Sequence, residues 1–583
     1  MPIFNYKNDE SIGKVYSVDT GTVLVSVSDV DSLRRMQVNH LVVLRSSRAG
    51  QHLIGVINKI MRKALVGANE QAEDSDDGEG YGAVVENIVR VTLIGTLLDA
   101  VGTEQNVFRR TLETVPEIDA PCFDLSGERL TEFMRAISKQ VVDGQKPLNL
   151  GKYTLDEEAD AWVDGNRFFQ RHAVVVGSTG SGKSWTVAHI AEQVASLPNA
   201  NAVLFDIHGE YGPLCGNGIS HLKVAGPGDL VANRKLSDGV LYLPYWLLTY
   251  EEMLAMLLDR SDQNAPNQAM VFNREVTESK RAYLEGAGKH DVLANFTVDS
   301  PVPYNIKDVL AKLVERDTEM VPGSGNRDKQ GAFHGKLTRF IQRLESKIGD
   351  RRLGFLFRAG DDAIRYEWMQ ELATVLLGST KVRGVGGVKI VDFSEVPSDI
   401  LPLIIGLVAR VVFSVQQWAE RDKQHPIALL CDEAHLYIPE RHETGISEEG
   451  LKSFERIAKE GRKYGVGLTV ISQRPAEVNR TVLSQCNNFV AMRLTNADDQ
   501  SVIRRLMPDT LGGFAELLPV LDIGEALVVG DAAILPSRIR IDEPTNHPSS
   551  ATVDFWDRWS EESTVNGIAA AVEALRRQQT SVP

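Results

Sequence analysis

The residues best suited to chemistry lie in one glycine-rich stretch, GSTGSGKS at 177–184. It fits the pattern G-x-x-x-x-G-K-[ST] at every fixed position, follows an apolar run at 173–176 and precedes residues with helical periodicity. Glycines let backbone N–H groups surround phosphate oxygens, and the start of the helix adds positive potential. The sequence therefore predicts a nucleoside triphosphate site formed by Gly177, Ser178, Thr179, Gly180, Ser181, Gly182, Lys183, Ser184 and the adjacent Trp185.

Besides Lys183 and Ser184 of this stretch, three residues elsewhere in the chain fit the chemistry of such a site: Asp432, Glu433 and Gln473. Lys183 is expected to reach the β- and γ-phosphates, and the Ser184 hydroxyl is expected to bind Mg²⁺. Asp432 ends an apolar run, where a carboxylate can hold Mg²⁺ through water, and Glu433 can act as general base on the attacking water. Gln473 ends another apolar run and can contact the γ-phosphate or that water, although capping of the loop is the alternative.

An arginine is the remaining part of many phosphoryl-transfer sites. Arg462 and Lys463 come at the predicted end of a helix, where cations are favoured in any case. The sharper interpretation of Arg462 is an arginine finger that reaches the nucleotide of the next subunit. Arg456 on the same helix is an alternative, and Arg171, just before the first strand of the site, is a weaker one.

The motif FDIHGEYG at 205–212 places Asp206, His208 and Glu210 at the end of another predicted strand. Open α/β sheets bind ligands at the carboxyl ends of their strands, so a coupling role and a purely structural turn are both open. No metal-ligand spacing indicates a second metal.

Composition limits the class of protein. The four cysteines form no C-x-x-C pair, which argues against a zinc site or disulfide framework and favours a reducing, cytoplasmic location. The N-terminus lacks the pattern of a signal peptide. The apolar stretch 400–415 carries Arg410 and is too short to span a membrane, so it is expected to be a buried helix. The net charge of −16 gives no global basic footprint, but a ring can confine positive charge to its channel.

The chain is long enough for two to four domains. Residues 1–115 predict a β-barrel, because short apolar runs recur at 12–18, 22–27, 40–44, 53–57 and 84–97 without helices between them. The acidic stretch 69–82 is expected to be a solvated loop. Residues 116–170 are expected to be a connector with one helix near 130–141.

Alternating strands and helices follow, which predicts a mainly parallel sheet in residues 171–245 and 373–545. Its strands are expected at 173–176, 202–207, 388–393, 427–431, 467–472, 488–494 and 526–529. Residues 246–372 predict an inserted helical subdomain with helices at 250–258, 268–285, 306–315 and 337–348. The basic segment 321–360 is either a solvated face or a contact for DNA or a partner. Residues 546–583 predict two short helices whose aromatic residues pack on the parent domain or on a neighbouring subunit.

The motifs RHAVVVGSTGSGKS, FDIHGEYG, LLCDEAHLYIP, EGRKYGVGL and SQRP, in that order, resemble the HerA family of the HerA/FtsK group. The resemblance implies a RecA-like core, a homo-hexameric ring, double-stranded DNA in a central channel and ATP sites at subunit interfaces. It gives Lys183, Ser184, Asp432, Glu433 and Gln473 the roles described above and favours a trans arginine near Arg462. It also implies a C-terminal extension that braces the neighbouring subunit.

The resemblance further implies a separate effector, either a NurA-type nuclease or a sirtuin-like protein, in DNA end processing or anti-phage defence. The effector is expected to bind at the barrel end of the ring.

The leading hypothesis is therefore an ATPase motor that threads duplex DNA. An ATP-gated scaffold that regulates a toxic partner is the main alternative. A DEAH-box helicase, suggested by residues 432–435, would need a second tandem domain for which residues 476–583 are too short. A conjugative coupling or secretion ATPase is a further alternative, but such a protein usually has a membrane anchor, and the sequence predicts none.

Overall fold

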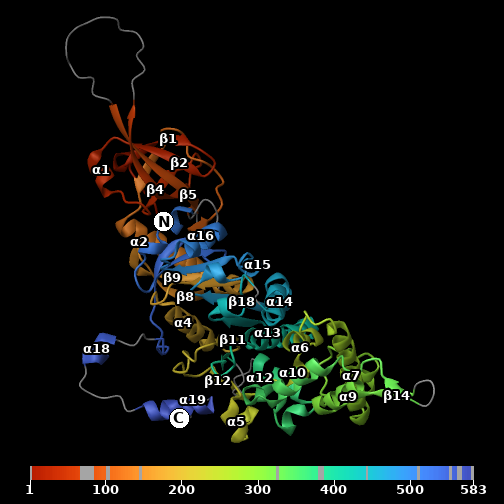
Figure 1. The fold of residues 1–583 in the computed structure, drawn as a ribbon. Helices are drawn as coiled ribbons and strands as arrows, with labels where there is room; N and C mark the ends of the chain where they lie inside the picture. Colours follow the sequence, from red (N-terminus) through yellow and green to blue (C-terminus); the bar gives the residue numbers. More distant parts are fainter. Residues whose placement is uncertain are drawn as a thin grey trace, which may run out of the picture. The chain divides into compact units, whose positions relative to one another are not determined.

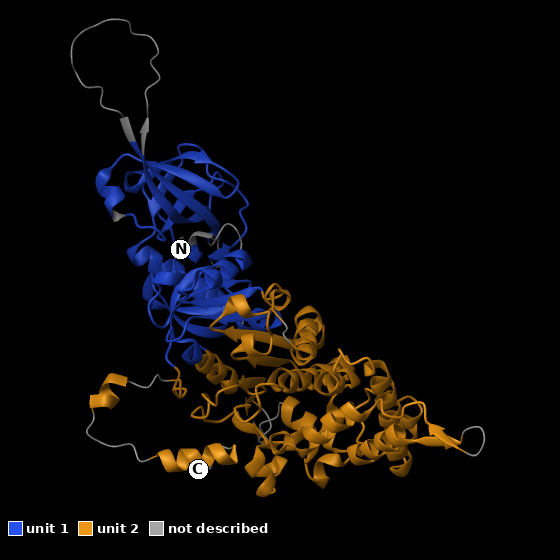
Figure 2. Cartoon of the chain, viewed as in Figure 1, with its two compact units in different colours: residues 1–186, 487–543 blue, residues 187–486, 544–583 orange. Residues whose placement is uncertain are grey.

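The structure is a computed structural model of the 583-residue chain. It describes residues 3–65, 84–99, 106–143, 147–322, 327–378, 387–441, 444–507, 512–550, 555–560 and 567–578. The chain forms two compact units, shown in different colours in Figure 2: unit 1 contains residues 1–186 and 487–543, and unit 2 contains residues 187–486 and 544–583. The predicted loop at 69–82 lies outside the described residues.

Unit 1 begins with a closed antiparallel barrel of six strands, which confirms the predicted β-barrel (Figure 1). The strand order is β2-β1-β7-β3-β4-β5, and pairing of β2 with β5 closes the barrel. Alternate side chains such as Val23, Val25 and Val27 are buried in its core. The strands are β1 (Gly13–Val18), β2 (Thr22–Val27), β3 (Leu41–Arg45), β4 (Gln51–Leu65), β5 (Val84–Leu98) and β7 (Pro121–Asp124), with β6 (Val107–Arg109) paired to β5 and α1 (Val30–Arg35) after β2.

The rest of unit 1 is a mixed sheet with strand order β10-β19-β20-β21-β8-β9. The strands β10 and β19 are parallel, and the other pairs are antiparallel. Its elements are α2 (Gly127–Asp143), β8 (Pro147–Tyr153), β9 (Asp156–Asp164), α3 (Gly165–Gln170), β10 (Ala173–Val176), β19 (Asn488–Met492), α16 (Ala497–Leu506), α17 (Gly512–Ala515), β20 (Glu525–Gly530) and β21 (Ser537–Ile541). The strands β7, β8 and β9 lie in the segment for which the sequence indicated only one helix.

Unit 2 contains six parallel strands in the order β13-β12-β16-β11-β17-β18. The strands β11, β17 and β18 are buried along their whole length, as expected for a parallel sheet covered on both faces. Their carboxyl ends share one edge, which is where a ligand binds in such sheets. The strands are β11 (Asn201–Asp206), β12 (Ile219–Val224), β13 (Val240–Leu241), β16 (Gly387–Asp392), β17 (Ile427–Cys431) and β18 (Val466–Ser472).

The predicted buried helix is α13 (Leu401–Trp418), and 13 of its residues, Leu401 and Val408 among them, are buried. By length and composition, α13 is the one helix among the described residues that is long and apolar enough to cross a membrane, and 72% of that stretch is buried inside the protein. Its Arg410 donates to Glu252 at 2.7 Å and to the carbonyl of Leu247 at 2.8 Å, so the charge within this helix is paired. It packs against α14 (Gly445–Glu460), where Gly406 meets Gly450.

The inserted helical part, drawn mostly in green in Figure 1, agrees with the prediction to within a few residues at each helix end. The helix α10 buries Phe340, Ile341 and Leu344 on one face. A hairpin of β14 (Met320–Pro322) and β15 (Asp328–Gln330) was not predicted. The helices are α6 (Tyr250–Leu257), α7 (Ala265–Gly286), α8 (His290–Leu293), α9 (Ile306–Thr318), α10 (Thr338–Gly349), α11 (Gly354–Phe357) and α12 (Trp368–Leu377), and unit 2 also holds α5 (Pro227–Val231) and α15 (Arg480–Leu483).

The C-terminal segment forms the two predicted helices, α18 (Phe555–Ser560) and α19 (Ile568–Arg577). The described residues leave the side chains of Phe555, Trp556 and Trp559 exposed, so no packing on the parent domain is found there. The segment before α18 is hydrogen-bonded to Glu192, whose carboxylate accepts the Thr545 and Asn546 N–H groups at 2.8 Å each. The predicted class is confirmed: an α/β fold with a P-loop, an N-terminal barrel, a helical insertion and C-terminal helices.

We predict that Gly450→Ala destabilises unit 2. A Cβ atom at Gly450 would overlap the carbonyl oxygen of Pro402, and α13 and α14 would have to separate. Overpacking of this kind costs about 1–3 kcal/mol, which lowers the melting temperature of a large domain by about 2–4 °C per kcal/mol. The measurement is thermal unfolding followed by circular dichroism. The control is Gly286→Ala at the end of α7, where a Cβ meets no atom within 4 Å. Equal melting temperatures for the two variants would contradict the close approach.

Candidate nucleotide site

The P-loop in unit 1 begins where the buried strand β10 ends. Gly180 and Gly182 have φ angles of +75° and +102°, in the left-handed region that glycine enters without a steric cost. Gly177 has no room for a side chain, because a Cβ there would lie 2.9 Å from the Cβ atom of Met492. The structure therefore favours glycine at Gly177 and Gly182, which the motif fixes, and also at Gly180, which it does not.

Residues far away in the sequence hold this loop in place. The N–H of Ser178 donates to the carbonyl of Arg493 at 2.8 Å, and the N–H of Gly524 donates to the carbonyl of Ser181 at 3.0 Å. The Thr186 hydroxyl closes the end of the loop by donating to the carbonyl of Gly182 at 3.1 Å. The ends of β19 and the start of β20 thus fix the loop, which the motif alone did not reveal.

The loop leads directly into α4 (Lys183–Ser196), within which the boundary of the two units falls. The Lys183 side chain is buried, while Ser184 and Trp185 are partly exposed. The first turn of α4 has no acidic residue, so its positive end is not neutralised from within the helix. This arrangement fits the binding of an anion such as a triphosphate.

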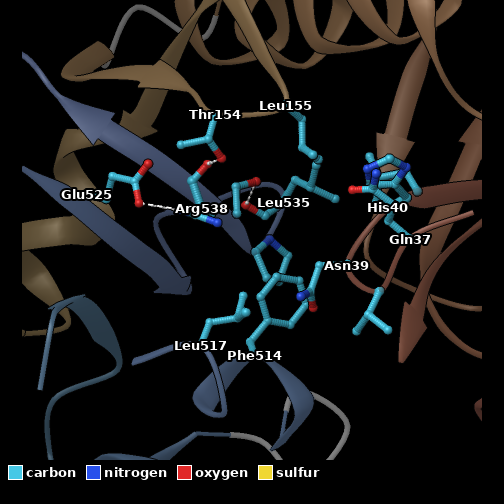
Figure 3. Close-up of a pocket in the computed structure, with 14 residues that line it drawn as sticks. Gln37, Asn39, His40, Thr154, Leu155, Phe514, Leu517, Glu525, Leu535 and Arg538 are labelled. Atoms are coloured by element: carbon cyan, nitrogen blue, oxygen red, sulfur yellow. Dashed lines mark hydrogen bonds and ion pairs between the residues drawn. The ribbon is translucent and has the colours of Figure 1, made fainter. Parts of the chain in front are cut away.

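A cavity of about 300 Å³ lies elsewhere in unit 1 (Figure 3). Its lining includes Asn39 of the barrel, Thr154 between β8 and β9, and Arg538 of β21, but none of the described P-loop residues. Glu525 accepts from Arg538 at 2.5 Å and directly follows Gly524, which supports the P-loop. The cavity is therefore next to the strand that supports the nucleotide loop and is not itself the predicted site.

The predicted carboxylates lie in unit 2, after the buried strand β17. Both oxygens of Asp432 accept hydrogen bonds: the Glu433 N–H donates to Oδ1 at 2.9 Å, and the Tyr211 hydroxyl donates to Oδ2 at 2.8 Å. The Tyr437 hydroxyl donates to the main-chain carbonyl of Asp432 at 2.8 Å. Burial raises the pKa of Tyr211 well above its ordinary value, so its phenol keeps the proton that it donates.

Glu433 has an unusual backbone for a residue with a side chain. Its φ and ψ angles of 46° and 42° lie in the left-handed region, and its side chain is buried. Strain of this kind concentrates at functional sites. His435 Nδ1 lies 3.4 Å from Glu433 Oε2 and 3.3 Å from the Ser472 hydroxyl, which links the end of β17 to the end of β18.

The turn after β11 carries Tyr211 to Asp432. Asp206 accepts the N–H groups of Glu210 and Tyr211 at 3.0 Å each, and burial raises the pKa of Asp206 to about 6. His208 is exposed. Among the residues of this motif, sequence reasoning singled out Asp206, His208 and Glu210 and missed Tyr211, whose contact joins positions 221 residues apart. The two tyrosines, Tyr211 and Tyr437, each follow a strand-end aspartate by five residues, which is the only local signal.

The other candidate side chains lie at opposite ends of the strands. Gln473 follows β18 at the same edge as Asp432 and is partly buried. Arg462 precedes β18, is exposed and forms no ion pair within the described part of the chain. The strand between them spans roughly 20 Å.

The two alternative arginines both have partners in their own chain. Arg456 stacks 5.0 Å from the Phe413 ring centroid and donates to Gln417. Arg171 precedes β10 and pairs with Asp531 at 2.7 Å, at the far end of that strand from the P-loop.

The described residues contain no group of three or more His, Cys, Asp or Glu side chains that could hold a metal ion. The two predicted metal-binding residues, Ser184 and Asp432, offer hydroxyl and carboxylate oxygens, which are the donors that Mg²⁺ prefers. Mg²⁺ usually keeps several waters and binds through one or two protein oxygens plus substrate phosphates. The residues present therefore fit a metal that arrives with its nucleotide.

Comparison with known proteins shows which proteins this chain resembles. Residues 148–412 match the family model for the central domain of helicase HerA. The DNA double-strand break repair helicase HerA of Saccharolobus solfataricus is 27% identical over 64% of this chain, and the chain covers 64% of that protein. The protein of the same name from Pyrococcus furiosus is 24% identical, with 69% of this chain and 70% of that protein aligned.

Over these ranges the chain is similar to HerA helicases. These similarities, together with the P-loop that follows β10, identify an ATP-hydrolysing enzyme of the P-loop class. Among solved structures, a bacterial conjugative coupling protein, TrwB, is similar with a TM-score of 0.44 and 13% identity, covering 70% of this chain and 92% of that one. In this chain, the P-loop residues lie in unit 1, while Asp432, Glu433 and Gln473 lie in unit 2.

We predict that Tyr211→Phe slows ATP hydrolysis by about tenfold, because loss of a buried hydrogen bond of about 1–1.5 kcal/mol frees one oxygen of the Asp432 carboxylate to rotate. The Mg²⁺ concentration for half-maximal rate should rise as well. Steady-state rates across a Mg²⁺ titration measure both effects. The matched control is Tyr437→Phe, which removes a buried hydroxyl bonded to the main chain of the same aspartate and should leave the Mg²⁺ dependence unchanged. Identical Mg²⁺ curves for the two variants would show that Tyr211 has no special role.

Proposed function

We propose that the chain is a ring-forming ATPase that moves along or unwinds double-stranded DNA. The observation that carries the proposal is the complete P-loop on a buried strand, in a chain that also places Asp432 and Glu433 at the ligand-binding edge of its parallel strands. Two relatives of similar length are named DNA double-strand break repair helicases, which supports DNA as the substrate.

The proposed roles follow from the chemistry of each residue. Lys183 binds the β- and γ-phosphates, with the backbone N–H groups of 177–184 around them. Ser184 and Asp432 hold Mg²⁺, which neutralises charge on the phosphate oxygens when it is bound. Glu433, buried and near His435, accepts the proton of the attacking water as general base. The Gln473 amide orients that water.

The position of Arg462 favours a site shared between subunits. In its own chain it lies at the amino end of β18, while Asp432 and Gln473 lie at the carboxyl edge. A single arginine cannot serve both edges, so we propose that Arg462 stabilises the phosphate charge of a neighbouring copy in a hexameric ring. Duplex DNA would pass through the central channel of that ring.

The proposal includes a separate effector protein, either a nuclease or a sirtuin-like enzyme, that docks on the barrel face and acts in DNA end processing or anti-phage defence. An ATP-gated scaffold with little movement on DNA is the competing function. Stimulation of ATP hydrolysis by duplex DNA, measured with and without the partner, separates the two functions. If duplex DNA does not stimulate ATP hydrolysis, and a displacement assay shows no ATP-dependent movement along DNA, the motor hypothesis is wrong.

We predict that Lys183→Ala abolishes ATP hydrolysis. The substitution removes the cation that faces the transferred phosphoryl group, and losses of this kind are about a hundredfold or more. Phosphate release under saturating ATP and Mg²⁺ measures the effect. Lys463→Ala, an exposed lysine outside the P-loop, is the control and should retain the full rate. Retained turnover in Lys183→Ala would remove the P-loop from its proposed role.

We predict that Arg462→Ala retains ATP binding but loses hydrolysis, and that mixing it with Glu433→Ala subunits restores part of the activity. In a mixed ring, some interfaces combine an intact Glu433 from one copy with an intact Arg462 from the next. ATP turnover across a series of mixing ratios measures the rescue. A rate that never exceeds the sum of the two separate variants would argue against a shared site.

A further inference from the structure

The segment 321–360 of the insertion is rich in positive charge, and none of its residues belongs to the predicted ATP site. It holds nine lysines and arginines against three acidic residues, in a chain whose net charge is −16. Three of these cations pair with carboxylates: Arg343 with Asp259, Lys347 with Asp399 and Arg352 with Asp350. The other six form no ion pair among the residues that the structure describes: Arg327, Lys329, Lys336, Arg339, Arg351 and Arg358.

Two of these six cations, Lys336 and Arg339, line one open groove. The groove has a volume of about 580 Å³ and lies between residues 261–268 and residues 335–339. The side chains of Lys336 and Arg339 are exposed along it. Its other polar residues include the hydroxyl groups of Ser261 and Thr338 and the amides of Gln263 and Asn264.

The walls of this groove are held by buried polar contacts. Gln268 is buried and donates to the carboxylate of Asp262 at 3.3 Å and to the carbonyl of Lys336 at 3.1 Å, which joins the two walls. Asp317 of α9 accepts from the Leu337 N–H at 2.7 Å and from the Thr338 hydroxyl at 2.6 Å. The start of α10 is therefore fixed. Lys336, whose ammonium group donates to the carbonyl of Ala332 at 2.8 Å, and Arg339 are exposed there.

The chemistry of the groove matches a phosphodiester backbone. Cations, hydroxyl groups and amides are the side chains that contact phosphates in duplex DNA. Asp262 is the one carboxylate among the described lining residues; it accepts from the Asn264 N–H and from Gln268, and these hydrogen bonds together with the charge of Arg339 lower its pKa. The described lining has no aromatic residue on which the bases of a single strand could stack. These features favour the backbone of a duplex over single-stranded bases.

The hairpin of β14 and β15 lies at the same end of the insertion, where it projects beside α9 (Figure 1), and β15 carries Asp328 next to Lys329. Lys329 on β15 is exposed, and the Gly331 N–H just after this strand donates to the carbonyl of Glu319 at the end of α9 at 2.8 Å. The Gly335 N–H, one residue before Lys336, donates to the carbonyl of Asp317 at 2.9 Å. The hairpin and the groove are thus attached to the same end of one helix.

We propose that the groove formed by residues 261–268 and 335–339 binds the phosphate backbone of duplex DNA without reading its sequence. This contact is separate from the ATP site, and it rests on the proposed DNA function. It gives the insertion a role of its own, because the described lining residues of the groove include neither P-loop residues nor Asp432 and Glu433.

The test compares the full-length chain with the double variant Lys336→Gln/Arg339→Gln. Binding of a labelled duplex is followed by fluorescence anisotropy over a series of salt concentrations. Each lost phosphate contact lowers the slope of log K against log salt by about 0.9, so the double variant should lose about 1.8. ATP hydrolysis without DNA should be unchanged. The matched control Lys307→Gln/Lys312→Gln removes two exposed lysines of α9 outside the groove and should keep the parent slope.

Two further arms make the outcome decisive. Lys336→Arg/Arg339→Lys retains both charges and should retain the slope, which separates charge from a local folding defect. Poly-glutamate replaces DNA to test for an acidic protein partner: a loss of poly-glutamate binding without a loss of duplex binding would overturn the proposal. A parent chain that binds duplex and a double variant with the parent slope would also overturn it, while leaving the proposed function intact. A parent chain that binds no duplex would overturn both.

Discussion

Asp432 sets the main constraint on unit 2, because a buried carboxylate is costly unless hydrogen-bond donors meet both of its oxygens. One donor comes from the next peptide group, and the other is the Tyr211 hydroxyl. Tyr211 reaches this position only because the turn after β11 is itself organised by a second buried carboxylate, Asp206. The position of Asp432 at the end of β17 thus depends on the turn that follows the neighbouring strand β11. Two adjacent parallel strands are therefore needed to hold this one aspartate.

The sequence predicts those parts of the fold that local patterns determine. The strand β17 was found to the residue because all five of its side chains are apolar and buried, and α10 was found because Phe340, Ile341 and Leu344 follow a helical period. The strand β9 was missed because its exposed positions carry Asp and Glu, which obscure a short alternating pattern. The P-loop was recognised from its spacing, but its support from Arg493 and Gly524 is a long-range property that no local window contains.

The direction of the strands separates the arginine candidates more clearly than their sequence context does. Arg171 and Arg462 both precede strands, so both lie at amino ends, away from the ligand-binding edge of their own chain. Arg171 is held by Asp531, whereas Arg462 is exposed and forms no ion pair within the described ranges. Cations in the insertion differ in the same way: Arg343 forms an ion pair with Asp259, whereas Arg339 lines an open groove and forms no ion pair among the described residues, although Asp262 lies on the same lining. In both places the cations that form no close ion pair are the ones available to a phosphate.

The left-handed backbone of Glu433 has a consequence for how this protein can change. Such a conformation costs about 1–3 kcal/mol in a residue with a side chain, and glycine would remove that cost. Selection for stability alone would therefore favour Glu433→Gly, which yields a sturdier protein that has lost its proposed general base. At this position, selection for thermal stability and selection for catalytic turnover favour different residues. A screen for thermostable variants that does not also measure activity would therefore select substitutions of Glu433.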